Sequence, residues 1–234
     1  MTMEAIVLAG GLGTRLRSVV ADLPKPMAPV GGRPFLAWLL DELDKAGFTK
    51  AILAVGYKHE VIKQHFGDRH GQMELAYSIE TEPLGTGGAL KQALNLATAP
   101  QVFVINGDTH IALNYNAMQQ AHEHAKSELT IAACAVPDVG RFGAMEIDSQ
   151  GHIAGFYEKG RTGPGHINGG VYLLAKGLLA KTPLPDKFSF ENDFLLPNLA
   201  AIKPLAFHTV GAFLDIGVPE DYARAAEMME TATK

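Results

Sequence analysis

The sequence predicts an α/β fold, in which a mixed, mostly parallel sheet is flanked by helices and followed by a second half rich in strands. Up to residue 128, short apolar runs alternate with segments whose apolar residues recur at helical spacing. This alternation gives parallel strands joined by right-handed crossovers. Beyond residue 128 the apolar runs are joined by short turns, which is typical of antiparallel strands. With 234 residues, 47% of them hydrophobic, the chain suits one domain, 1–234, in two halves that meet at residue 128.

The elements of the first half follow from these runs and from the residues that end them. Strands are expected at residues 5–9, 51–55, 74–79 and 102–105, and helices at residues 35–46, 60–66 and 87–97. Gly47 would end the first helix. Ligands of parallel sheets bind at the carboxyl ends of the strands, so the residues that follow each strand are candidates for a site.

The second half is expected to form an extension or a lid over the parallel half. Its strands are expected at residues 129–136, 143–147, 152–158, 170–174, 205–209 and 212–214, and its helices at residues 192–201 and 219–230.

The charge distribution argues against nucleic acid and membranes as partners. The formal net charge of −5 provides no overall basic field. Cationic side chains nonetheless gather near the N-terminus, where residues 10–33 hold Arg15, Arg17, Lys25 and Arg33 against a single acid. Such a local cluster can hold an anionic substrate.

Cysteine use and the N-terminal segment predict the compartment. The single cysteine, Cys134, excludes an intramolecular disulfide and a Cys-rich zinc site, and it suits a reducing compartment. The apolar run at residues 5–9 is too short for a signal peptide or a membrane span. We therefore expect a cytoplasmic protein.

The strongest motif is a glycine-rich loop, LAGGLGTRL at residues 8–16, directly after the first strand. Glycines let the N–H groups of a loop point at phosphate oxygens. The loop has no lysine in the Walker position, and Leu16 stands where the dinucleotide fingerprint needs its third glycine. What remains is G-x-G-T-R at residues 11–15, nine further residues, and Lys25 between two prolines that fix its backbone. Arg15 can donate two parallel hydrogen bonds to phosphate oxygens, and Lys25 adds a point charge.

This motif resembles the signature of the sugar nucleotidyltransferases, and the resemblance spans residues 5–222. It implies a Rossmann-like nucleotide-binding first half, a sugar-binding second half, and transfer of a nucleoside monophosphate from an NTP to a sugar 1-phosphate. Segments 18–29, 187–191 and 215–222 resemble the guanylyltransferases of heptose 1-phosphates within the family, which implies GTP as the donor and a GDP-heptose for bacterial surface glycans. The residues implied to wrap the triphosphate are Leu8, Ala9, Gly10, Gly11, Gly13, Thr14 and Arg15, together with Lys25.

Two aspartates, Asp108 and Asp215, follow extended segments 107 residues apart. A hard divalent cation that bridges phosphates needs oxygen ligands, often one or two carboxylates. The resemblance implies that these two side chains hold Mg²⁺, and that Arg15, Lys25 and Asp108 are catalytic. Taken alone, each aspartate is equally consistent with a turn residue or a helix cap.

The segment after the third strand carries the candidates for base recognition. Glu80 stands where similar enzymes that read uracil or thymine have glutamine. A carboxylate only accepts hydrogen bonds and guanine offers two adjacent donors, so Glu80 favours guanine, unless it is simply a surface charge at a strand end. The predicted nucleotide site is completed by Gly85, Thr86, Asn106 and Gly107.

On the sugar side, the resemblance implies contacts from Gly143, Glu158, Lys159, Asn168 and Gly169. Glu158 can accept hydrogen bonds from sugar hydroxyls, and Lys159 can pair with the phosphate. The Asn168 amide can both donate hydrogen bonds to hydroxyls and accept them. Residues 168–170 are expected to open a strand. Exposed polar residues of hairpins are the alternative for this group.

Three alternatives stay open at this point. The same chemistry could use UTP or dTTP with a hexose 1-phosphate, or GTP with mannose 1-phosphate. The chain could also be a non-catalytic subunit that binds a nucleotide sugar, or a nicotinamide-dependent oxidoreductase, although the third glycine of that fingerprint is missing. The oligomeric state, a homodimer included, is left open.

Overall fold

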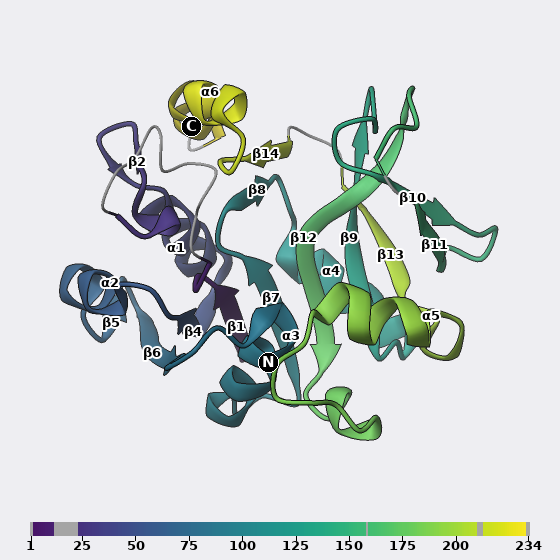
Figure 1. Ribbon diagram of the computed structural model, residues 1–234, viewed down its shortest axis with the longest axis horizontal. Coiled ribbons are helices and arrows are strands. Elements are labelled where there is room, and N and C mark those ends of the chain that lie inside the picture. Colours follow the sequence, from purple (N-terminus) through teal and green to yellow (C-terminus); the bar gives the residue numbers. More distant parts are fainter. Residues whose placement is uncertain (1, 12–22, 158, 210–212, 233–234) are drawn as a thin grey trace.

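The computed structural model describes residues 2–11, 23–157, 159–209 and 213–232, and within these the central feature is one sheet of ten strands (Figure 1). Along the sheet the strands lie in the order β11-β10-β12-β7-β1-β4-β6-β5, and β9 pairs with both β12 and β13. The strands of this sheet are β1 (Met3–Leu8), β4 (Phe48–Val55), β5 (Arg69–His70), β6 (Met73–Ile79), β7 (Gln101–Asn106), β9 (Leu129–Val136), β10 (Ala144–Ile147), β11 (Ile153–Tyr157), β12 (Gly165–Ala175) and β13 (Leu205–Thr209).

Shorter strands and the helices complete the described chain. Two small sheets pair β2 (Pro29–Val30) with β3 (Arg33–Pro34) and β8 (Thr109–Ile111) with β14 (Phe213–Asp215). The α-helices are α1 (Phe35–Ala46), α2 (His59–Phe66), α3 (Gly85–Ala93), α4 (Tyr115–Ala125), α5 (Leu196–Ile202) and α6 (Pro219–Ala232). The short helical segments are η1 (Lys25–Met27), η2 (Leu94–Leu96), η3 (Leu179–Lys181) and the π-helix η4 (Phe190–Leu195). In the part of the chain with described coordinates, no helix is long and apolar enough to span a bilayer.

The order in which the chain adds parallel strands to the sheet reverses beside β1, while β4, β6 and β7 keep the direction of β1. The chain runs from β1 to β4 and β6 on one side, and then returns to place β7 on the other side of β1. Leu8 at the end of β1 lies opposite Asn106 at the end of β7. Ligands of open α/β sheets bind at such a switch point, outside the carboxyl ends of the strands.

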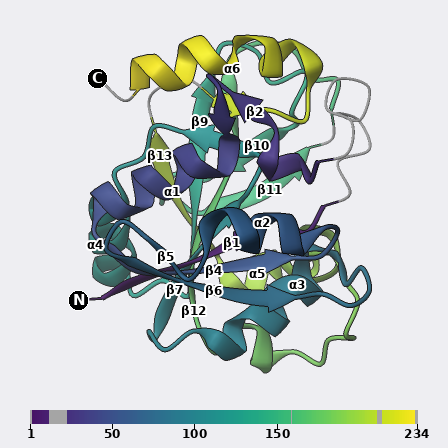
Figure 2. The same ribbon diagram turned by 90° about the vertical axis from the view of Figure 1, so that its left-hand side faces the viewer.

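The sequence of β1 from Ala5 onward is a continuous apolar run because this strand is buried on both faces of the sheet. Ala5 and Val7 belong to the core cluster that includes Leu36 and Leu40 of α1, whereas Ile6 belongs to the cluster that includes Leu90 of α3. Figure 2 shows α1 and α3 on opposite faces of the sheet. The predicted α/β class, with a mixed and mostly parallel sheet flanked by helices, is confirmed.

The second half continues the same sheet as an extension. β12 pairs antiparallel with β7, β9 pairs antiparallel with β12, and β13 pairs parallel with β9. The strand predicted at residues 170–174 is longer in the structure. β12 begins at Gly165 and already contains residues 168–170, which were expected to open it. The pairing with β9 shifts between Asn168 and Tyr172, and Gly170 in this bulge has φ +74°. A Cβ there would lie 2.9 Å from the Asn106 amide nitrogen, so the bulge packs against the end of β7.

Two helices differ from the sequence prediction. Helix α4 was not predicted, although Asn114 caps it by accepting the Ala117 N–H at 2.9 Å and Tyr115, Met118 and His122 are buried at helical spacing. The helix expected at residues 192–201 begins earlier, as the π-helix η4, and becomes regular only at Leu196. Pro197 cannot donate a hydrogen bond to the preceding turn, which accounts for the interruption.

Candidate active site

A cavity of about 780 Å³ opens at the switch point, where β1 and β7 end side by side. Its lining contains every described residue that was predicted to hold the nucleotide: Leu8, Ala9, Gly10, Gly11, Lys25, Glu80, Gly85, Thr86, Asn106, Gly107 and Asp108. The predicted Gly13, Thr14 and Arg15 lie outside the described residues. The loop after β4, with Gly56, Tyr57 and Lys58, and His59 at the start of α2 also line the cavity and were not predicted. Because β4 is a parallel strand, the rule that ligands bind at the carboxyl ends of such strands could have predicted this part of the lining.

Gly10 leaves room for the side chain that was predicted to read the base. A Cβ on Gly10 would lie 2.3 Å from Oε1 of Glu80, so any larger residue would displace this carboxylate. The other oxygen, Oε2, accepts the Leu84 N–H at 3.0 Å. Burial raises the pKa of Glu80, and the Leu84 N–H opposes this rise. Glycine at position 10 therefore allows Glu80 to keep this position, in addition to any contact of its N–H group with phosphate.

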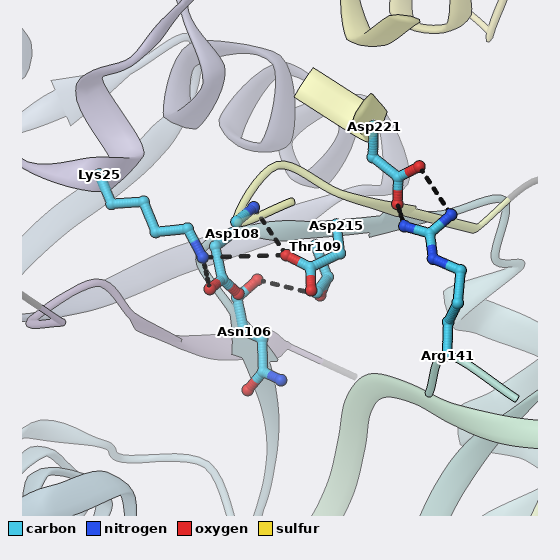
Figure 3. A network of polar contacts seen from close by, with 8 residues as sticks. Lys25, Asn106, Asp108, Thr109, Arg141, Asp215 and Asp221 are labelled. Carbon is cyan, nitrogen blue, oxygen red and sulfur yellow. Dashed lines mark hydrogen bonds and ion pairs between the residues drawn. The ribbon is translucent and has the colours of Figure 1, made fainter. Parts of the chain in front are cut away.

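Lys25 lies at the first position of η1, between Pro24 and Pro26, and its side chain is only 15% exposed. Its ammonium donates a hydrogen bond to Asp108 and lies 3.8 Å from Oδ1 of Asp215 (Figure 3). One cation thus connects the two carboxylates that the sequence singles out.

The short sheet β8–β14 brings the two aspartates together. Thr109 pairs with Asp215 across this sheet, and the Ile216 N–H donates to the Asp108 carbonyl at 3.0 Å. The Gly217 N–H donates to Oδ1 of Asp215 at 2.7 Å. Burial, and then the negative charge of Asp108, raise the pKa of Asp215, while the Gly217 N–H and Lys25 oppose the rise. The two carboxylates therefore interact directly.

A second cavity, of about 420 Å³, adjoins the first, and Asn106 lines both. The described residues around it include the predicted Gly143, Lys159, Asn168 and Asp215, and also Thr109, Arg141, Phe142, Tyr157, Glu191, Asn192 and Leu196. The predicted Glu158 lies outside the described residues. Gly169 is not part of this lining, because it faces the core, where a Cβ would lie 2.9 Å from the side chain of Ile111.

Comparison with known proteins identifies the family of the chain. The profile of the nucleotidyl transferase family matches residues 4–232. The chain belongs to this family. A D-glycero-alpha-D-manno-heptose 1-phosphate guanylyltransferase of Aneurinibacillus thermoaerophilus is 44% identical, over 97% of this chain and 99% of the relative. Its counterpart from Campylobacter jejuni is 43% identical, over 94% and 97%. The crystal structure of HddC from Yersinia pseudotuberculosis complexed with GMP-PN is 41% identical, with a TM-score of 0.86, over 97% of this chain and 99% of that chain.

In this nucleotidyl transferase the second cavity contains a polar network that sequence reasoning missed. Oε1 of Glu191 accepts hydrogen bonds from the Asn168 amide at 2.8 Å and from the Tyr172 hydroxyl at 2.6 Å. Burial, and then Glu191, raise the pKa of Tyr172 well above its usual value, so this hydroxyl stays a donor. Glu191 lies on the π-helix η4, and π-helical turns are frequent at functional sites. Glu191 thereby orients the amide of Asn168.

Proposed function

We propose that this nucleotidyl transferase transfers GMP from GTP to D-glycero-alpha-D-manno-heptose 1-phosphate and releases pyrophosphate. The observation that carries the proposal is the pair of adjoining cavities. Asp108 lines the first cavity, Asp215 lines the second, and the ammonium of Lys25 contacts both carboxylates. A nucleotide in the first cavity and a sugar 1-phosphate in the second would meet at these three side chains. The heptose and the guanine follow the names of the two relatives that are 44% and 43% identical.

In the proposed reaction an oxygen of the sugar phosphate attacks the α-phosphorus of GTP in line with the leaving pyrophosphate. One P–O bond forms and one breaks, and no covalent enzyme intermediate is needed. Catalysis then consists of positioning and of neutralising charge. Lys25 neutralises phosphate oxygens, and the N–H groups of Gly10 and Gly11 are proposed to donate to them.

The carboxylates suit a divalent cation. Two interacting carboxylates, one with its pKa raised by the other, gain from a positive charge placed between them. Mg²⁺ is commonly held by one or two carboxylates together with substrate phosphates. In the proposal, Asp108 and Asp215 hold Mg²⁺, which when bound adds positive charge to the reacting phosphates. The sequence-predicted Arg15 is proposed as a further phosphate contact.

The compartment and the biological role are part of the same proposal. GTP and sugar phosphates are metabolites of the cytoplasm, and the only cysteine, Cys134, is buried. The GDP-heptose that is formed would serve bacterial surface glycans.

A matrix of four NTPs against a panel of sugar 1-phosphates tests the proposal by the rate of pyrophosphate release. We expect the highest kcat/KM for GTP with the heptose 1-phosphate. A higher value for mannose 1-phosphate, or for UTP or dTTP with a hexose 1-phosphate, would assign a different substrate pair. Binding of a nucleotide sugar without any pyrophosphate release would indicate a non-catalytic subunit.

Changing Glu80 to Gln should weaken the preference for guanine. The amide can keep the hydrogen bond from Leu84 but cannot accept two hydrogen bonds side by side, so the ratio of kcat/KM for GTP over UTP should fall about tenfold or more. Glu82→Gln is the matched control, because Glu82 lines the same cavity two residues further on. An unchanged ratio in Glu80→Gln would remove Glu80 from base recognition.

A further inference from the structure

Arg141 brings a positive charge to the second cavity that the sequence analysis did not anticipate. It lies between β9 and β10, lines the cavity, and its side chain is 49% exposed. The guanidinium also lies over the ring of Phe142, 5.1 Å from the ring centroid. Because it packs against the ring of Phe142, the guanidinium of Arg141 has a restricted set of positions.

A buried carboxylate holds this guanidinium in place. Asp221, in the first turn of α6, is 1% exposed and accepts from Nη2 of Arg141 at 3.1 Å and from Nη1 at 3.5 Å (Figure 3). It also accepts from Nη2 of Arg224 at 2.6 Å. Arg224 alone balances the charge of Asp221, so Arg141 adds a surplus positive charge. Of the two arginines, only Arg141 lines the cavity.

A second cation lies on the neighbouring loop. Lys159 lines the same cavity, and the two loops are joined by the Gly160 N–H, which donates to the Gly140 carbonyl at 3.3 Å, and by the Val139 N–H, which donates to the Gly163 carbonyl at 3.0 Å. The cavity therefore has a basic wall formed by Arg141 and Lys159, and its lining also includes hydroxyl-binding groups such as Asn168 and Glu191. A ligand with a doubly charged anionic group and several hydroxyls matches this division.

We propose that Arg141 binds the phosphate of the sugar 1-phosphate and that Asp221 is its positioning residue. The inference rests on the proposed function. A planar guanidinium can donate to two phosphate oxygens at once, and it is preorganised when a buried carboxylate accepts from Nη1 and Nη2 and leaves the Nε edge for the phosphate. Because only residues 216–218 separate Asp215 from α6, the Arg141–Asp221 pair also fixes the basic wall relative to the carboxylates that meet Lys25.

Steady-state rates of pyrophosphate release test the inference with the best substrate pair of the matrix. Arg141→Gln should raise the KM for the sugar 1-phosphate about 10- to 100-fold and leave the KM for the NTP within about twofold. Inorganic phosphate, used as a competitive inhibitor against the sugar 1-phosphate, should lose affinity in the same variant. Asp221→Asn should raise the same KM by a smaller factor, because it loosens the guanidinium without removing it.

Arg69→Gln is the matched control, since Arg69 is an exposed arginine that lines neither cavity, and the change should alter both KM values by less than about twofold. Thermal unfolding of each variant separates a loss of fold from a loss of binding. An unchanged KM for the sugar 1-phosphate in Arg141→Gln, or an equal rise for both substrates, would overturn the inference while the proposed function stands. A wild-type protein that releases no pyrophosphate with any pair would instead overturn the proposed function.

Discussion

Replacing Asp108 by alanine should lower kcat by about 10²–10³-fold while the protein stays folded. The change removes one of the two carboxylates that meet at Lys25, together with the acceptor of the Lys25 hydrogen bond. The side chain of Asp108 lies at the surface of the cavity and outside the core, so the thermal unfolding midpoint should change little. The measurement is pyrophosphate release at saturating concentrations of both substrates.

Two further variants isolate the charge of Asp108. Asp108→Asn keeps the shape and loses the negative charge, and it should be almost as inactive as the alanine variant. Asp186→Ala is the control, because Asp186 is 94% exposed and pairs with Lys91 away from the cavities. An Asp108→Ala protein that kept more than about a tenth of the wild-type kcat would remove Asp108 from the catalytic residues.

Replacing Lys25 by alanine should lower kcat by a similar factor of about 10²–10³. The variant loses the cation that neutralises phosphate oxygens, and it leaves Asp108 and Asp215 facing each other without a counter-charge. Because Lys25 lowers the pKa of Asp215 and its removal must raise it, the residual activity should be lost at a higher pH on acidification than in the wild type. Rates of pyrophosphate release across pH measure both effects.

Lys181→Ala provides the comparison for Lys25, because it removes a surface ion pair, the one with Glu128, by the same substitution. Such exposed pairs contribute little, so its kcat and its pH profile should match those of the wild type. A Lys25→Ala profile shifted to lower pH would contradict the interaction between Lys25 and Asp215 described above.

The elements that the sequence predicted best have local causes. Helix α1 was predicted with its observed bounds because its apolar residues recur at helical spacing and because Gly47 can adopt the left-handed conformation, with φ 89°, that ends it. The nucleotide-site residues could be found because they follow strands, and the strands of a parallel sheet all end at the same edge.

The residues that were missed depend on contacts between distant parts of the chain. Glu191 reaches Asn168 only because η4 packs near β12, and Arg141 reaches Asp221 across 80 positions of sequence. Gly169 was expected at the sugar site beside Asn168, but both lie in β12, where successive residues face opposite sides of the sheet, and Gly169 faces Ile111.

The amino-acid sequence alone determined the α/β class, the family, the glycine-rich loop with Lys25, and the pair of aspartates. Each of these depends only on the spacing or the type of residues along the chain. Only the tertiary structure decided that Asp215 lies beside Asp108, through the pairing of β8 with β14, and that two cavities meet there. It also decided that Arg141 faces the second of them. The physical reason is that strand pairing and core packing bring these residues together, and both are properties of the whole folded chain.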